Sequence, residues 1–131
     1  MIGLDTNVLI RYLTKDDTSQ YAKAKRLIDD AVAQDERLLI SSSVLCELTW
    51  VLESAYDYSR SEIADVLERI LDTAQFEVER AREARDALRD FQSGKAGFAD
   101  ALIGRINRTL GATYTATFDR DLKSLDTFRL L

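Results

Sequence analysis

The hydrophobic positions of this chain follow two patterns that alternate along its length. Short runs of consecutive apolar residues are typical of buried parallel strands, and stretches with apolar residues every three or four positions are typical of amphipathic helices. The alternation predicts an α/β fold with a parallel sheet. The predicted strands span residues 2–4, 38–40, 76–78, 114–118 and 125–131. The predicted helices span residues 7–13, 19–34, 80–92 and 98–110, with two more that follow the serines at 41–43 and 59.

Local residue chemistry supports several of these helix boundaries. Ser59 and Glu62 form a capping-box pattern, in which each side chain bonds the backbone N–H of the other residue. Gly111 follows the helix over 98–110 and suits the left-handed conformation in which many helices end.

The helix that ends at Tyr56 has a carboxylate beside its predicted core face. Glu47 borders the predicted inward stripe, and a carboxylate at the margin of a core is rarely left without a partner. Trp50 lies on a face turned away from that stripe, where it is a candidate anchor for a partner, although burial in the monomer core is an equal alternative. The inward stripe consists of Val44, Leu48, Val51 and Ala55.

Length and composition are those of one globular domain. The chain has 131 residues and no proline, with 46% hydrophobic and 31% charged residues. No apolar run approaches the roughly 20 residues of a membrane span, and the first residues lack a basic leader. Cys46 is the single cysteine, so the chain has no internal disulfide. We expect its side chain to be a buried apolar residue of the core. We therefore expect a single domain over residues 1–131, located in the cytoplasm, with no membrane partner.

The absence of histidine restricts the possible chemistry. It excludes nucleophilic catalysis by Ser-His-Asp or Cys-His groups and zinc bound by histidine. Acid–base or metal chemistry must therefore rely mainly on carboxylates.

Charge is distributed unevenly along the chain. The net charge is −5, which argues against non-specific binding of nucleic acid. Residues 1–79 nevertheless carry 8 basic and 16 acidic side chains, whereas residues 80–131 carry 10 basic and 7 acidic ones. Two interpretations are open: the basic side chains of the C-terminal part bind a phosphate backbone, or they only keep the exposed helix faces solvated.

Four acids lie at or near the carboxyl ends of predicted strands, where open parallel sheets bind ligands. Asp5 and Asp119 directly follow strands, and each alone is also explained as a helix N-cap. Glu47 lies one turn into a helix, and Asp100 lies in the first turn of another, where it also suits the helix dipole.

Together the four carboxylates point to a metal site. Two carboxylates about 5 Å apart repel by roughly 3 kcal/mol at an effective dielectric constant near 20. Proteins retain such clusters to hold hard cations, and oxygen ligands select Mg²⁺ or Mn²⁺ over zinc. Such a site suits phosphodiester hydrolysis, in which the metal activates water and neutralises charge.

Four segments, taken in order, resemble the PIN family and its VapC branch of toxins. They are residues 3–10 (GLDTNVLI), Glu47 within a serine-capped helix, residues 98–103 (FADALI) and residues 115–121 (TATFDRD). The resemblance implies a three-layer α/β/α sandwich with a short central parallel sheet. It also implies cleavage of RNA by water at a Mg²⁺ or Mn²⁺ site, a homodimer and a VapB-like antitoxin that occupies the active-site groove.

The resemblance also implies roles for individual residues. Asp5, Glu47, Asp100 and Asp119 are the expected catalytic and metal-binding acids. Gly97 departs from the family, because many relatives carry another acid before the phenylalanine, so no role is assigned to it. The expected supporting residues, which orient carboxylates or waters, are Thr6, Asn7 and Thr117, with Asp121 as an accessory acid.

Other functions fit the sequence less well. A haloacid-dehalogenase-like phosphotransferase needs a second Asp where this chain has Asn7, and a receiver domain needs an Asp after the third strand, where Val78-Glu79-Arg80 stands. The remaining alternatives are a housekeeping PIN nuclease of RNA processing and a non-catalytic PIN-like interaction module.

Overall fold

Three short parallel strands form the sheet of the N-terminal part. The computed structural model describes the whole chain, residues 1–131. The strand order is β1-β2-β3, and Leu38 of β2 pairs with Ile2 of β1 and with Phe76 of β3. The strands are β1 (Ile2–Gly3), β2 (Leu38–Ile40) and β3 (Phe76–Val78).

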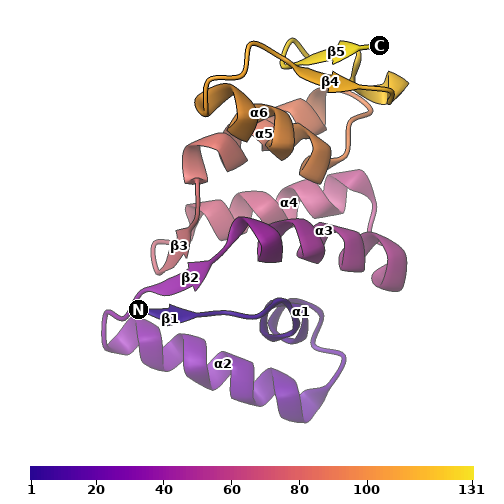
Figure 1. Cartoon of the computed structure of the whole chain (residues 1–131). Helices are drawn as coiled ribbons and strands as arrows, with labels where there is room; N and C mark the ends of the chain where they lie inside the picture. Colours follow the sequence, from indigo (N-terminus) through magenta and orange to yellow (C-terminus); the bar gives the residue numbers. More distant parts are fainter.

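Helices cover both faces of this sheet, which gives the α/β/α layering that the sequence predicts (Figure 1). Helices α1 (Thr6–Thr14) and α2 (Thr18–Ala33) lie on one side, and α3 (Ser42–Tyr56) and α4 (Arg60–Asp72) lie on the other. The capping box of Ser59 and Glu62 is present at the start of α4, as predicted.

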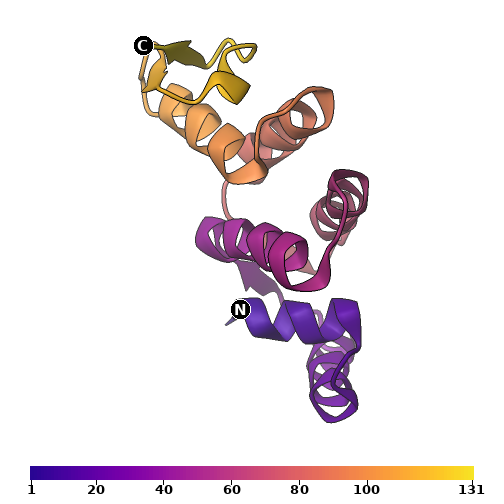
Figure 2. The same ribbon diagram turned by 90° about the vertical axis from the view of Figure 1, so that its right-hand side faces the viewer.

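The C-terminal part carries a second sheet of its own. Helices α5 (Ala81–Ser93) and α6 (Phe98–Thr109) pack on each other, followed by β4 (Thr115–Thr117), the short 3₁₀ helix η1 (Arg120–Leu122) and β5 (Phe128–Leu130). Strands β4 and β5 pair in parallel with each other and with no other strand. Both ribbon views place the C-terminal strands, in yellow, at one end of the molecule, well apart from the N-terminus, where β1 begins (Figures 1 and 2).

The molecule accordingly exposes more surface than is typical of a folded chain of its mass. Its accessible surface is 7747 Å², against about 7,000 Å² expected for a folded chain of this mass. The extra surface includes Ile2 and Gly3, which are exposed along the free edge of β1. All five predicted strands are present, but they form two separate sheets and not one continuous sheet.

The buried face of α3 differs from the predicted stripe. Val44 and Val51 are only half-buried and Ala55 is exposed. Neighbouring residues on a helix are about 100° apart, and α3 contacts α1, α4 and α6, so its buried face is turned toward the larger leucines. The fully buried leucines are Leu45, Leu48 and Leu52.

Gly104 permits close contact between α6 and β5. A Cβ atom at this position would lie 2.5 Å from a ring carbon of Phe128 and 2.8 Å from the hydroxyl of Thr127. The absence of a side chain therefore sets the distance between the helix that carries Asp100 and the sheet of β4 and β5, after whose first strand Asp119 lies.

Candidate functional site

Asp100 lies in the first turn of α6, next to a buried face. Phe98, Ala99, Ala101 and Leu102 on both sides of it are buried. Burial raises the pKa of the half-buried Asp100 carboxyl, and the negative charge of Asp119 raises this pKa further. The folding of α6 against its neighbours thus holds a carboxylate partly out of water, within electrostatic range of a second one.

Asp119 lies two residues after the end of β4 and is the N-cap of η1. One oxygen of its carboxylate accepts a hydrogen bond from the backbone N–H of Asp121 at 2.9 Å. The Thr117 hydroxyl accepts the backbone N–H of Asp119 at 3.0 Å. Thr117 therefore fixes the backbone of the loop that presents Asp119, whereas Asp121 contributes a backbone contact and its side chain is exposed.

Cys46 and Glu47 lie on α3, which faces α6. Burial raises the pKa of the half-buried Cys46 thiol, and the charge of Asp100 raises it further. Glu47 is exposed and lines a groove between α3 and α6 together with Cys46. Cys46 on α3 is therefore within electrostatic range of Asp100, and Glu47 lines the groove.

The three remaining predicted residues lie at the start of α1. The Asp5 carboxylate caps this helix by accepting the backbone N–H of Asn7 at 3.3 Å. Thr6 is buried, and Asn7 is exposed. Asp5 thus has the N-cap role that was its ordinary explanation, and its own side chain is exposed.

The structure brings part of the predicted acidic set together. Asp100 and Asp119 interact electrostatically, but no group of three or more acidic or cysteine side chains is arranged to hold one metal ion. The reason is the division of the sheet: Asp5 follows β1 in one sheet, and Asp119 follows β4 in the other. The oxygen donors fit Mg²⁺ or Mn²⁺ chemically, and two of the four acids are close enough to repel.

The groove between α3 and α6 is mostly apolar and has a volume of about 400 Å³. Trp50 and Ile103 lie on its two walls, and their exposed fractions are 59% and 49%. Glu47 lies in the same wall as Trp50, so one of the four predicted acids lines the groove. The exposure of Trp50 confirms its prediction as an outward-facing side chain and contradicts the alternative of burial in the monomer core.

Arg60, which holds the segment before Asp100 in position, was not identified from the sequence. Arg60 donates hydrogen bonds to the carbonyl oxygens of Phe91, Gly94 and Ala96, at 2.6, 3.0 and 2.8 Å. These carbonyls belong to the end of α5 and to the loop that leads to Asp100. Backbone acceptors leave no signature in a sequence, so no pattern pointed to Arg60.

Comparison with known proteins places this arrangement in a family. The family model described as "PIN domain" matches residues 2–127. The chain belongs to the PIN domain family. This confirms the family and the fold class predicted from the sequence.

A curated relative gives a closer comparison within the PIN domain family. The chain is 27% identical over 122 residues to a VapC ribonuclease of Aquifex aeolicus (strain VF5), and the match covers 93% of this chain and 90% of the relative. No solved structure matches the chain significantly. None of the helices of this PIN domain is both long and apolar enough to cross a membrane.

Proposed function

We propose that this PIN domain is an endoribonuclease that depends on Mg²⁺ or Mn²⁺ and acts as the toxin of a toxin–antitoxin pair. The observation that carries the proposal is the pair of like-charged carboxylates, Asp100 and Asp119, held within electrostatic range by α6 and the β4–η1 loop. The similarity to a VapC ribonuclease over nearly the whole chain supports the substrate and the toxin role.

The proposed catalytic and metal-binding acids are Asp5, Glu47, Asp100 and Asp119. A divalent cation held by these carboxylates would activate water and neutralise charge on the phosphate undergoing cleavage. Asp100 and Asp119 are the pair that the fold already brings together, so they are the first candidates to hold it. The proposed supporting residues are Thr6, Asn7, Thr117 and Asp121.

The chain's own residues have distinct tasks in this proposal. Thr117 fixes the backbone at Asp119, and the buried neighbours of Asp100 keep its carboxylate partly desolvated, which strengthens its attraction for a cation. Asp5 and Glu47 are proposed to complete the set of oxygen ligands.

The proposed partners are an RNA substrate, a VapB-like antitoxin and a second copy of the chain, and the proposed location is the cytoplasm. A free ribonuclease would damage its own cell, so an inhibitor is needed. The apolar groove at Trp50 and Ile103 adjoins Glu47, and an inhibitor helix seated there would place a cationic side chain at the acids.

The first experiment measures cleavage of cellular RNA by the purified protein with Mn²⁺, with Mg²⁺ and with EDTA. We expect cleavage with either ion and its loss with EDTA. Asp100→Asn and Asp119→Asn should each abolish most of the activity, whereas Glu53→Gln, an exposed acid on the same helix as Glu47, should retain it. Equal activity in EDTA, or wild-type cleavage by Asp100→Asn, would contradict the assignment.

The second experiment separates a toxin from a housekeeping nuclease. Expression of the protein alone should slow growth, and co-expression with a small neighbouring gene should restore it. Sequencing of RNA 5′ ends after brief induction then identifies the cleaved RNA. Normal growth at high levels of active protein would favour the housekeeping function.

A further inference from the structure

A cleft of about 360 Å³ lies between α1 and α2, away from the groove at Trp50. Its apolar floor includes Val8 and Leu27. Its polar wall consists of Asn7, Arg11, Gln20 and Lys23. The proposed function does not use this cleft.

The charges of the cleft have one sign. Arg11 and Lys23 are the charged residues that line it, and both are cationic. The surrounding segment is strongly acidic, since residues 1–79 carry 8 basic and 16 acidic side chains. Lys23 is exposed and forms no ion pair, so its ammonium is available to an anion. Because Arg11 pairs with Asp16, Lys23 supplies the uncompensated positive charge of the cleft within this acidic part of the chain.

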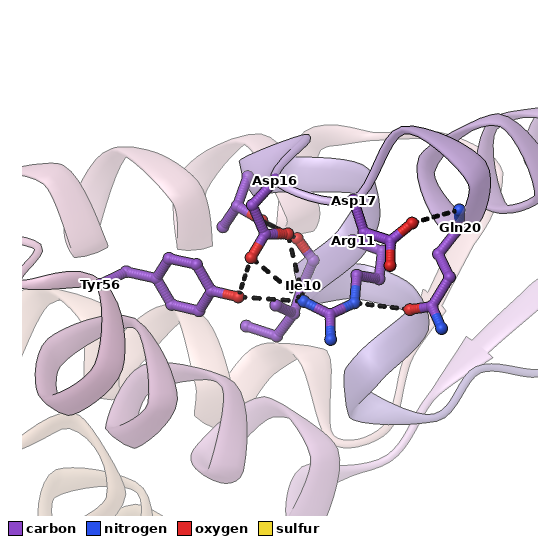
Figure 3. A network of polar contacts seen from close by, with 7 residues as sticks. Ile10, Arg11, Asp16, Asp17, Gln20 and Tyr56 are labelled. Atoms are coloured by element: carbon purple, nitrogen blue, oxygen red, sulfur yellow. Dashed lines mark hydrogen bonds and ion pairs between the residues drawn. The ribbon is translucent and has the colours of Figure 1, made fainter.

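Hydrogen bonds hold the Arg11 guanidinium in place, and one of its three nitrogens has no partner. Its Nη1 donates to both oxygens of Asp16, at 3.1 and 3.2 Å, and to the hydroxyl of Tyr56 at 3.2 Å. Its Nε donates to Gln20 at 2.6 Å. Figure 3 shows the second terminal nitrogen pointing away from these partners without a contact. The guanidinium is thus oriented in advance, which lowers the entropy cost of binding a phosphate.

The cleft begins beside Asp5, one of the four proposed catalytic acids. Asn7 lines it, and the backbone N–H of Asn7 is bound by Asp5. Arg11 follows four residues later, about one turn along α1. A strand whose phosphate reaches Asp5 would meet Arg11 and Lys23 as it continues along the cleft.

We propose that the cleft between α1 and α2 binds the RNA backbone next to the cleavage point. Phosphate oxygens contact Arg11 and Lys23, and an unstacked base lies against the apolar floor at Val8 and Leu27. This inference rests on the proposed ribonuclease function and adds a substrate-binding surface to it. Binding of single-stranded RNA in this way is electrostatic, so its strength depends on salt.

The test compares Lys23→Gln and Lys23→Glu with Lys25→Gln and Lys25→Glu. Lys25 lies on the same helix and changes the net charge equally, but it pairs with Asp29 and does not line the cleft. Each substitution is combined with Asp100→Asn so that the RNA stays intact. Affinity for a labelled single-stranded RNA of mixed sequence is measured over a range of salt concentrations, and cleavage is measured without Asp100→Asn.

We expect Lys23→Gln to weaken binding about fivefold at 0.1 M salt and to reduce the slope of log K against log salt by about 0.7, the value for one lost phosphate contact on a single strand. Lys23→Glu should weaken it further, and the Lys25 variants should bind and cleave as the parent does.

Equal effects at the two positions, in a protein that cleaves RNA, would overturn the cleft proposal alone. Loss of inhibitor binding with unchanged RNA affinity in Lys23→Glu would assign the cleft to a protein partner instead. A wild type that neither binds nor cleaves RNA would remove the ribonuclease function and this inference together.

Discussion

The guanidinium of Arg60 lies over the ring of Phe91, with its central carbon 4.1 Å from the ring centroid. The same side chain binds three carbonyl oxygens at the end of α5 and in the following loop. One residue at the start of α4 therefore fixes the path of the chain into α6 and the position of Asp100.

Replacement of Arg60 should affect both stability and catalysis. Arg60→Ala removes a cation–π contact and the charged donor of three carbonyls, which should cost about 2 kcal/mol of unfolding free energy. RNA cleavage should fall in kcat more than in KM, because α6 loses its fixed approach while the substrate surface remains. Chemical denaturation and steady-state kinetics measure the two effects.

Arg69→Ala is the matched control for Arg60, because Arg69 lies on the same helix and its side chain forms no ion pair or hydrogen bond. Arg60→Lys should recover little activity, since an ammonium does not reproduce the planar fork of donors. If Arg60→Ala and Arg69→Ala behave alike, the positioning role of Arg60 is wrong.

The contact of Gly104 with β5 leads to a second prediction. Alanine is favoured over glycine in a helix by about 1 kcal/mol, yet its Cβ would overlap the ring of Phe128 and the hydroxyl of Thr127. Gly104→Ala should therefore destabilise the protein by about 1–3 kcal/mol despite its better helix propensity. Gly3→Ala, where no atom lies within 4 Å of the added carbon, should change little. A stabilised Gly104→Ala protein would show that α6 and β5 separate readily.

Much of the fold followed from the sequence because local chemistry sets it. The capping box at Ser59 and Glu62 and the positive φ of Gly111 were predictable from residue type. The buried face of α3 was not, because its neighbours α1, α4 and α6 decide which side of the helix is covered. The exposure of Trp50 was predicted as one of two alternatives.

The members of the candidate site stay a prediction, and their geometry was foreseen only in part. Asp100 and Asp119 were identified as acids at the ends of strands or in a first turn, and they interact in the structure. Asp5 was expected at the same sheet edge, but pairing between β1 and β4 depends on long-range contacts that no local pattern reports. The hydrogen bonds of Arg60 to backbone carbonyls were invisible for a related reason, since every residue has a carbonyl.

The raised pKa of Asp100 predicts how stability depends on pH in the absence of metal. Burial, and then the charge of Asp119, raise this pKa in the folded protein. The folded state then binds the proton more tightly than the unfolded chain, so this group stabilises the fold at low pH. Its contribution is lost as pH rises from the ordinary range of an aspartate through the raised pKa.

Asp100→Asn removes that dependence. In EDTA, the variant should be more stable than the wild type at pH 7, by on the order of 1 kcal/mol or less because the carboxyl is only half-buried. The difference should shrink as pH falls through the raised pKa. Thermal unfolding of both proteins from pH 4 to pH 7 measures it. A wild type that gains stability relative to Asp100→Asn as pH rises would contradict the direction of the shift.

The groove between α3 and α6 leads to the last prediction, which concerns binding of the proposed inhibitor. Trp50 and Ile103 expose 59% and 49% of their surfaces on its two walls, so truncating them should cost the folded monomer little. An exposed tryptophan that becomes buried in a complex often contributes 2 kcal/mol or more to binding. Trp50→Ala should therefore weaken the complex with the small neighbouring protein about thirtyfold or more, since every 1.4 kcal/mol is a factor of about ten. Leu110→Ala, an exposed apolar residue outside the groove, is the control. Titration calorimetry gives the affinities, and growth under co-expression gives the consequence, because Trp50→Ala should stay toxic where the wild type is neutralised. If both variants bind the inhibitor as the wild type does, the groove is not its docking site.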